Sequence, residues 1–389
     1  MGDWKEYKLG DISDIQTGPF GSQLHQCDYV DVGTPCIMPT NIGTHLDIKP
    51  EGIAHVKEED VIRLNKHCVK AGDIIYSRRG DVEKCAFISL REEGWLCGTG
   101  CLRIRINSKN VNPHFIAYQL STKESKKWIV GNAVGTTMLN LNTGILKELP
   151  LLMPDRLLQD SVVTILKSID DKIECNRRIN ENLEQQAQAL FKSWFVDFEP
   201  FKDQPFVESE LGMIPQGWIV ETLGNLLDIK YGKDHKKLSD GEIPVYGSGG
   251  LMRYAEKALY SGESVLIPRK GSLNNVMYVN EAFWTVDTMF YSIPKVSDVM
   301  LYSYIYLSNR DLSSLNAGSA VPSMTTEILN SMKVVFPDNI VLKDFNKKAQ
   351  TLYKSMKLYE QESRRLAELR DTLLPKLMSG EINVNEVKL

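Results

Sequence analysis

The stretch VVTILKSIDDKIECNRRINENLEQQAQALFKSWF, residues 162–195, decides the fold of this chain. Within it, a stripe of mostly apolar residues recurs at alternating spacings of four and three, which is a heptad pattern with a period of 3.5 residues. No proline or glycine interrupts residues 160–195, so the stretch can form one continuous helix. The stripe consists of Val162, Leu166, Ile169, Ile173, Asn176, Asn180, Leu183, Ala187, Leu190 and Trp194.

A second stripe in the same phase follows when 183 is added to each position. Residues 342–374 contain no proline or glycine either, so they predict a second long helix. The second stripe consists of Phe345, Ala349, Leu352, Met356, Tyr359, Ser363, Leu366, Arg370, Leu373 and Leu377. The polar residues Asn176, Asn180 and Ser363 lie near the middle of the stripes. Either they fix the register of a helix pair, or they face water where the helices diverge.

The chain also repeats itself outside the stripes. A tryptophan, a Leu-Gly pair and a glycine recur with one spacing, and two further segments match in the same order. The matching segments are 4–18 with 218–232, 72–80 with 262–271, and 145–155 with 328–338. Several matches in order indicate two copies of one fold.

Outside the long helices each copy has the pattern of short strands and turns. Cys101–Ile106 alternates apolar and polar residues, and Val276–Val279 is β-prone. Glycine-rich turns occur at 18–21 and 247–250, and short helices are predicted at 113–120 and 300–307. The fold class is therefore α+β: two pseudo-repeated, strand-rich globular domains separated in sequence by two long helices. Two like units tend to associate about a two-fold axis, which predicts that the helices form an antiparallel coiled coil. The predicted segments are domain 1 at 1–155, a helical spacer at 156–198, a linker with domain 2 at 199–338, and a second helical spacer at 339–389.

Composition narrows the class of protein. The chain has 389 residues, a net charge of −4 and 42% hydrophobic residues. It has no apolar run of the roughly 18–20 residues that a membrane span needs, and its polar N-terminus lacks a signal peptide, so we expect a cytoplasmic protein. Six of seven cysteines fall within the first 101 residues without a CxxC pair, which favours reduced, buried, metal-free thiols over disulfides or zinc.

Motifs for chemistry are missing from the sequence. We find no P-loop, GxSxG or HExxH pattern and no nuclease-like set of carboxylates. Residues 112–115, Asn-Pro-His-Phe, resemble the Asn-Pro-Pro-Phe loop of DNA amino-methyltransferases, but His114 replaces the second proline. Helix entry at Pro113 is the better account. We therefore expect no catalytic residue and no cofactor bound by this chain.

Three segments resemble one protein family. Residues 189–200 (ALFKSWFVDFEP), 212–218 (GMIPQGW) and 369–382 (LRDTLLPKLMSGEI) are similar to the central and C-terminal regions of Type I restriction–modification specificity subunits. The order domain–helix–domain–helix matches that family along the whole chain. The resemblance implies two target-recognition domains, each of which contacts one half of a bipartite, asymmetric double-stranded DNA target. It also implies two methyltransferase (modification) subunits and restriction subunits that translocate DNA as partners. S-adenosylmethionine, ATP and Mg²⁺ would belong to those partners.

Candidate DNA-binding residues follow from side-chain chemistry, since arginine can bind guanine and amides or hydroxyls can bind other base edges. Each could instead be ordinary loop surface. In domain 1 the candidates are Ser22, Gln23, Ser77, Arg78, Arg79, Thr136, Thr137 and Asn140. In domain 2 they are Lys233, His235, Lys236, Tyr246, Ser248, Arg269, Lys270, Ser272 and Asn274. Arg103 and Arg105 share one face of a strand, and we expect them on the side of the sheet that faces DNA or solvent.

Two other functions stay open at this point. The chain could be a DNA-modifying enzyme with its own recognition domains, in which case it would bind S-adenosylmethionine alone. It could also be a coiled-coil scaffold, in which case substitution of Arg79 or Arg269 would leave DNA binding unchanged.

Overall fold

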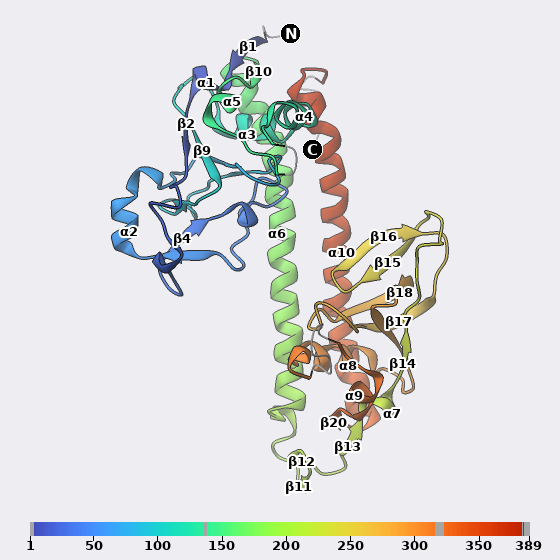
Figure 1. The fold of residues 1–389 in the computed structure, drawn as a ribbon. Coiled ribbons are helices and arrows are strands. Elements are labelled where there is room, and N and C mark those ends of the chain that lie inside the picture. The colour runs from blue at the N-terminus through green and yellow to red at the C-terminus, as the bar shows by residue number, and fades with distance from the viewer. Residues whose placement is uncertain (1–3, 136–137, 316–322, 383, 385–389) are drawn as a thin grey trace. The chain divides into compact units, whose positions relative to one another are not determined.

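The computed structural model describes residues 4–135, 138–315, 323–382 and 384. Contacts divide the chain into unit 1, which comprises Met1–Glu174 and Ser363–Leu389, and unit 2, which comprises Cys175–Glu362. The two long helices, α6 (Arg156–Phe195) and α10 (Asn339–Met378), each contribute one part to each unit (Figure 1). This division cuts across the sequential segments expected from the sequence.

In its described part, unit 1 contains two four-stranded sheets and one strand pair. The sheets have the orders β2-β9-β6-β7 and β3-β5-β4-β8, and β1 pairs with β10. The strands are β1 (Lys5–Lys8), β2 (Ser13–Thr17), β3 (Tyr29–Val30), β4 (Thr34–Ile37), β5 (Ala54–Val56), β6 (Ile74–Ser77), β7 (Cys85–Phe87), β8 (Leu96–Cys97), β9 (Cys101–Ile106) and β10 (Pro150–Met153). The short α-helices are α1 (Leu9–Ile12), α2 (Glu58–Arg63), α3 (Pro113–Ser121), α4 (Lys123–Asn132) and α5 (Thr143–Lys147).

Unit 2 contains, in its described part, one six-stranded sheet of order β14-β19-β17-β18-β15-β16 and the pairs β13–β20 and β11–β12. The strands are β11 (Phe206–Ser209), β12 (Gly212–Pro215), β13 (Ile219–Thr222), β14 (Leu227–Tyr231), β15 (Ile243–Gly247), β16 (Gly250–Ala255), β17 (Tyr260–Pro268), β18 (Met277–Thr285), β19 (Met289–Pro294) and β20 (Lys333–Phe336). The short α-helices are α7 (Leu223–Leu226), α8 (Met300–Ser308) and α9 (Thr326–Ser331).

The two units share one topology, as the sequence repeat predicts. The order β2-β9-β6-β7 in unit 1 corresponds to β14-β19-β17-β18 in unit 2, and the pair β1–β10 corresponds to β13–β20. Each unit also has one parallel strand pair, which is β4 with β8 in unit 1 and β15 with β18 in unit 2. The long strand β18 takes the places of both β7 and β8, which is why unit 2 has one large sheet where unit 1 has two. The predicted short elements are confirmed as β9, α3 and α8.

The repeated Leu-Gly and Gly residues mark close contacts of the backbone. The Leu9 N–H donates to the Leu149 carbonyl and the Leu223 N–H donates to the Met332 carbonyl, at 3.0 and 2.8 Å, and both leucines are fully buried. A β-carbon on Gly18 would lie 2.1 Å from the Gly98 carbonyl oxygen, and one on Gly232 would lie 2.0 Å from that of Val286. Only glycine fits where two backbones approach so closely.

The two long helices run antiparallel within each unit. In unit 1 the guanidinium of Arg370 binds the carboxylate of Asp170 at 2.9 Å. In unit 2 the amide of Asn176 donates to Glu362 at 2.8 Å, and that of Asn180 donates to the Met356 carbonyl at 3.2 Å. Partner numbers in α10 fall as those in α6 rise, so the predicted antiparallel pairing is confirmed.

All twenty positions of the two stripes are buried or half-buried. Asn176 does not face water: it is fully buried, and its amide hydrogen-bonds across the helix pair, whereas Asn180 and Ser363 are half-buried. An amide at such a position favours one register, because a shifted register would bury it without that partner. Of the two accounts of these residues, the structure favours register control.

Aspartates cap both long helices at their first turns. The Asp155 carboxylate accepts from the Leu158 N–H at 3.0 Å, and the Asp338 carboxylate accepts from the N–H groups of Ile340 and Val341 at 2.8 and 3.0 Å. A side-chain acceptor there satisfies N–H groups that have no partner inside the helix. The repeated Pro-Asp pair of the sequence is therefore a helix start in both units.

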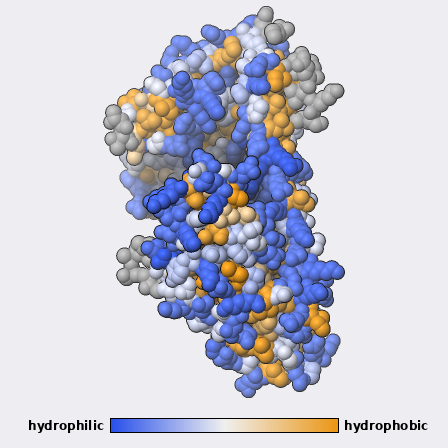
Figure 2. All heavy atoms as spheres, turned by 90° about the vertical axis from the view of Figure 1, so that its right-hand side faces the viewer, coloured by the Kyte–Doolittle hydropathy of each residue, from blue (hydrophilic) through white to orange (hydrophobic). Residues whose placement is uncertain are grey.

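The cysteines carry free thiols, and four of the seven are buried. Cys27 and Cys175 are exposed, so the expectation of buried thiols is wrong for these two. Burial raises the pKa of Cys36 and of Cys85 to about 12. Among the described residues, no helix is both long enough and apolar enough to cross a membrane. On the face drawn in Figure 2, hydrophobic residues form small patches interrupted by hydrophilic ones.

Replacing Gly18 or Gly232 with alanine should destabilise the protein, because a β-carbon would push apart two paired backbones. We expect each substitution to lower the free energy of unfolding by about 1–3 kcal/mol, measured by urea unfolding followed by circular dichroism. Gly21→Ala is the matched control, since no atom lies within 4 Å of a β-carbon at this position. Equal midpoints for Gly18→Ala and Gly21→Ala would contradict this account of the repeat.

Candidate DNA interface

Two equivalent arginines follow the central strands β6 and β17. In unit 1 Ser77, the last residue of β6, pairs with Cys101, and in unit 2 Pro268, the last residue of β17, pairs with Met289. Arg78 and Arg269 are the next residues, and their backbone groups have partners at equivalent positions of the two units. Their N–H groups donate to Gly100 and Thr288, both at 2.8 Å, and their carbonyls accept from Leu141 and Met324 at 2.8 and 2.9 Å. The match between 72–80 and 262–271 thus corresponds to one loop in two copies.

Each arginine also lies against an aromatic ring. The guanidinium carbon of Arg78 is 5.6 Å from the ring centre of Phe20, and that of Arg269 is 5.3 Å from the ring centre of Tyr231. Arg78 Nε donates to the Leu141 carbonyl at 3.3 Å, and Arg269 Nη1 donates to the Asp287 carbonyl at 3.2 Å. Burial, followed by the neighbouring Arg79, lowers the pKa of Arg78. A cation held by a ring face and a carbonyl has fewer orientations than a free surface arginine.

The structure gathers several candidates of unit 1 around Arg78. Phe20 is in the turn that includes Ser22 and Gln23, where the Gln23 N–H donates to the Phe20 carbonyl at 2.8 Å. Arg79 is exposed and forms a bridge with Asn140. Ser77 differs from the others because its side chain is buried and donates to the Arg79 carbonyl at 3.2 Å. Thr136 and Thr137 lie outside the described residues.

In unit 2 a second group of candidates gathers beside Arg269. Lys270 is exposed and forms a bridge with Ser323, as Arg79 does with Asn140. Ser248 lies beside this loop: a β-carbon on Gly271 would be 3.0 Å from the Ser248 Oγ, and the Ser248 carbonyl accepts from the Asn275 amide at 2.8 Å. Ser272 is exposed. Asn274 is held by the segment after α8: its amide nitrogen donates to Asp311 and its amide oxygen accepts from the Ser313 N–H, both at 3.0 Å.

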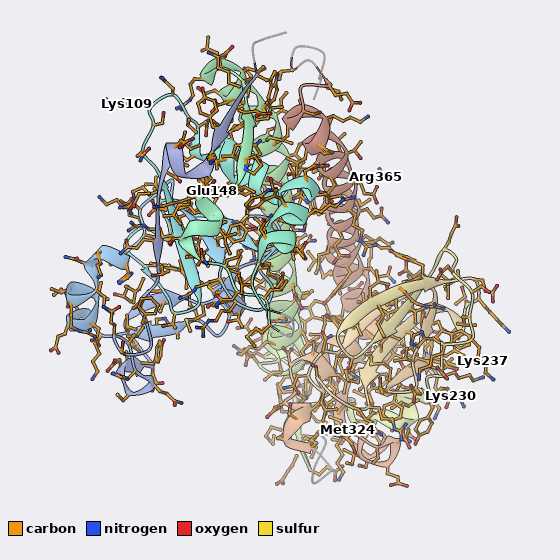
Figure 3. The ribbon with its side chains drawn as sticks, turned by 45° about the horizontal axis from the view of Figure 1, so that its top comes forward. Lys109, Glu148, Lys230, Lys237, Met324 and Arg365 are labelled. Carbon is orange, nitrogen blue, oxygen red and sulfur yellow. The ribbon has the colours of Figure 1, made fainter. Side chains whose placement is uncertain are left out.

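The remaining candidates lie on or beside the segment that follows β14. Lys233 and Lys236 are exposed there, and Figure 3 shows the nearby Lys237 projecting away from the unit. The carbonyl of Lys233 accepts from the Trp284 indole at 2.9 Å, and the carbonyl of half-buried His235 accepts from Arg253 at 3.3 Å. Tyr246 in β15 donates its hydroxyl to Glu281 at 3.0 Å.

Phe20 and Tyr231 are the residues that sequence reasoning missed. Phe20 follows a Gly-Pro pair, and Tyr231 lies in a segment for which no element was predicted, so neither has a spacing that marks it. Their role depends on β6 and β17, because the residue after each of these strands is the arginine that lies over the ring. A basic residue after one strand and an aromatic residue after another are each common. Only the contact between the two side chains, which the tertiary structure shows, marks them as part of a candidate site.

The expectation that Arg103 and Arg105 face DNA or solvent is wrong for Arg103, and Arg105 is only half-exposed. Arg103 is buried and donates to Asp14 at 3.1 Å and to the Lys66 carbonyl at 2.7 Å. Arg105 makes two hydrogen bonds to the buried carboxylate of Asp73, at 2.7 and 2.6 Å. Alternation along β9 correctly placed both arginines on one face, but their guanidinium groups bind protein carboxylates and carbonyls there. Arg103 is buried and not available to a ligand, whereas Arg105 is half-exposed with its guanidinium bound to Asp73.

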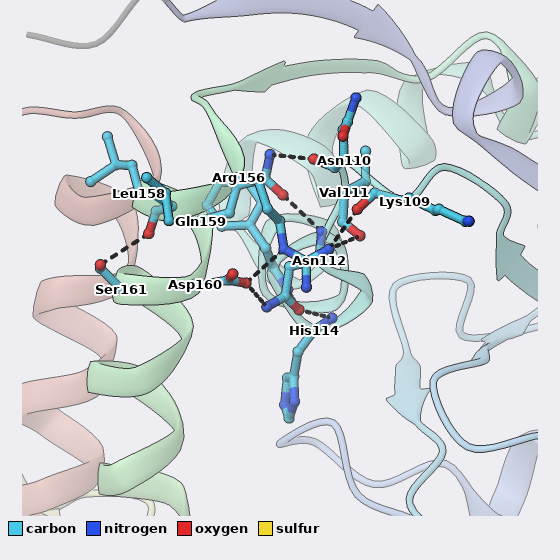
Figure 4. A network of polar contacts seen from close by, with 12 residues as sticks. Lys109, Asn110, Val111, Asn112, His114, Arg156, Leu158, Gln159, Asp160 and Ser161 are labelled. Atoms are coloured by element: carbon cyan, nitrogen blue, oxygen red, sulfur yellow. Dashed lines mark hydrogen bonds and ion pairs between the residues drawn. The ribbon is translucent and has the colours of Figure 1, made fainter.

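The Asn-Pro-His-Phe segment forms a helix start, as expected. Asn112 accepts from the His114 N–H at 2.9 Å and donates its amide to Asp160 at 2.6 Å (Figure 4). Arg156 binds the same carboxylate at 2.8 Å and also donates to the Val111 carbonyl at 3.0 Å. The amide of Asn112 therefore caps α3 and ties it to the first turns of α6.

Comparisons with known proteins identify the family. The family model described as "Type I restriction modification DNA specificity domain" matches residues 1–185 and 215–352. This covers most of the chain. The protein belongs to the Type I restriction–modification DNA specificity family, and the resemblance noted in the sequence is confirmed.

Curated relatives and a solved structure agree with that assignment. The chain is 24% identical to the Type I restriction enzyme MjaIX specificity subunit of Methanocaldococcus jannaschii, over 99% of this chain and 95% of the relative. It is also 24% identical to the HindI specificity subunit of Haemophilus influenzae, over 98% of this chain and 100% of the relative. A crystal structure of a Type I S subunit from M. genitalium shares the fold, with a TM-score of 0.60 and 18% identity over 97% of this chain and 96% of that one.

Removing the Arg105 guanidinium should destabilise unit 1 without changing which bases are recognised. Arg105→Met would leave Asp73 buried without its cation, at a cost of about 2–3 kcal/mol in the free energy of unfolding. This figure is below that of a fully buried pair because Arg105 is 31% exposed. Urea unfolding measures the effect. Arg91→Met is the control, since Arg91 is largely exposed beside Glu92, and it should change stability by less than about 1 kcal/mol.

The stability of unit 1 should fall as pH is lowered through the range set by His114. Its ring is stacked between Phe87 and Tyr118, with ring centres 4.0 and 5.0 Å away. Burial, helped by Lys167, lowers the pKa of His114 from 6.5 to about 4. As pH falls below 6.5, this histidine takes up a proton in the unfolded chain but not in the folded chain. The free energy of unfolding is therefore highest above pH 6.5 and decreases as pH falls from 6.5 to about 4. The loss is about 3 kcal/mol.

The variant His114→Phe isolates this contribution, because it keeps an aromatic ring in the stack but cannot take up a proton. Urea unfolding at several pH values should show a shallower decline between pH 6.5 and 4 than in the wild type. His25→Gln, at an exposed position, should leave the wild-type decline intact. Identical pH profiles for His114→Phe and the wild type would refute the assignment.

Proposed function

We propose that this chain determines the DNA sequence recognised by a Type I restriction–modification complex, with one unit contacting each half of a bipartite, asymmetric target. The observation that supports the proposal is the pair of equivalent loops after β6 and β17. Each loop presents an arginine held against a ring and an exposed basic neighbour, Arg79 or Lys270. The topology is shared, but the flanking residues differ, as suits two half-sites of different sequence.

The chain acts with partners in this proposal. Two modification subunits and the restriction subunits supply methyl transfer, translocation and cleavage in the cytoplasm. S-adenosylmethionine, ATP and Mg²⁺ bind to those subunits, and this chain supplies none of the catalytic groups. A net charge of −4 supports the need for partners, because a chain with this charge adds little general attraction to the phosphate backbone.

The antiparallel helices set the gap between the half-sites in this proposal. A helix rises about 1.5 Å per residue, so one heptad adds roughly 10 Å, or about three base pairs of DNA. Insertion of one heptad into both α6 and α10, at the level of the Asn176–Glu362 contact, preserves the phase of the stripes. We expect the unread gap to lengthen by about three base pairs while both half-sites stay unchanged.

Methylome sequencing of cells that express this chain with its modification subunits measures the half-sites and the gap together. A heptad in α6 alone is the control, and we expect it to abolish methylation because the stripes no longer match. A scaffold without DNA contacts would give no change of motif in either variant. If the chain were an enzyme with its own cofactor site, the purified chain alone would bind S-adenosylmethionine. Equilibrium dialysis measures this binding.

A further inference from the structure

We propose that Arg78 and Arg269 each bind the O6/N7 edge of a guanine, so that each half-site contains a G·C pair that is read by its own unit through the same loop. This inference rests on the proposed function and adds one base of each half-site to it. The equivalence of the two loops and the donors that each arginine leaves free together support it.

Each guanidinium is fixed in a way that keeps a two-donor edge available. Arg78 uses Nε for the Leu141 carbonyl, and its Nη1 and Nη2 have no hydrogen-bond partner among the described residues. Arg269 uses Nη1 for the Asp287 carbonyl, and its Nε and Nη2 are left without a partner in the same part of the chain. Two adjacent N–H donors in one plane match the two acceptors of guanine in the major groove.

The aromatic rings favour contact with a base edge over a loose contact with phosphate. Phe20 and Tyr231 each cover one face of the guanidinium, so the plane of the group is set before DNA binds. A planar group with a preset orientation can discriminate between bases, whereas a mobile cation attracts any phosphate. Both arginines are only half-buried, so part of each residue remains open to solvent.

The neighbouring basic residues provide a contrast within the same loops. Arg79 and Lys270 are exposed, and among the described residues neither side chain contacts an aromatic ring or makes a hydrogen bond. They follow the fixed arginines directly in sequence. This arrangement suits a phosphate contact beside a base contact, because exposed flexible cations provide attraction without fixed geometry.

The test uses the complex of the full chain with its modification subunits and the variants Arg78→Gln and Arg269→Gln. Glutamine pairs with adenine as arginine pairs with guanine, so each variant should relax one G of the wild-type motif or shift it to A. Methylome sequencing should show the change in one half-site for Arg78→Gln and in the other for Arg269→Gln. Binding to wild-type duplexes, measured by fluorescence anisotropy, should weaken roughly 5- to 150-fold.

Arg79→Gln and Lys270→Gln are the matched controls. We expect them to weaken binding to all duplexes alike and to leave the motif unchanged. Arg78→Lys and Arg269→Lys keep the charge but lose the planar guanidinium that packs on the ring, so they should weaken binding to the wild-type duplexes. The midpoint of thermal unfolding should be the same for every variant as for the wild type, which verifies that the variants remain folded.

Three results would overturn the inference. A wild-type half-site without any G·C pair excludes a guanine contact by that unit. An unchanged motif in Arg78→Gln or Arg269→Gln, with binding weakened equally for all duplexes, identifies a phosphate contact. A wild-type complex that methylates no bipartite motif would overturn the proposed function as well, whereas the first two results leave it standing.

Discussion

Completion of each hydrophobic core by both long helices is the constraint on which the rest of this structure depends. The core of unit 1 includes Val162 and Leu166 from α6 together with Leu377 and Met378 from α10. The core of unit 2 includes Phe191 and Phe195 from α6 together with Phe345 and Ala349 from α10. Each core thus joins segments that are far apart in sequence. Neither strand-rich part buries its apolar face fully without the antiparallel helix pair.

This constraint explains why the repeat extends over the entire chain. In each unit the end of one long helix and the start of the other pack against the same set of strands, so a change in either helix alters a core as well as the coiled coil. The caps Asp155 and Asp338 fix where the helices begin, and Asn176 favours one register. Within each unit, the helix register therefore determines where the ends of the strands lie.

The candidate interface shows how one scaffold supports two specificities. Backbone hydrogen bonds place Arg78 and Arg269 identically, which the scaffold requires in both units. The rings that hold them come from different places: Phe20 follows β2 in a turn, whereas Tyr231 ends β14 itself. The surrounding segments are free to differ because they add little to the cores. Selection can therefore alter base preference without disturbing the fold.

By itself, the sequence determined the two long helices, their antiparallel pairing, the repeat and the family, because heptad spacing and repeated motifs are local patterns that one fold requires. It also located the equivalent arginine loops. Only the tertiary structure decided that Arg103 and Arg105 are internal ion-pair partners, that Ser77 is buried, and that Phe20 and Tyr231 hold the arginines. The physical reason is that the environment of a polar side chain is set by residues that meet it from other parts of the chain. Asp73 and Phe20 reach their arginines across strand pairings that no local spacing records.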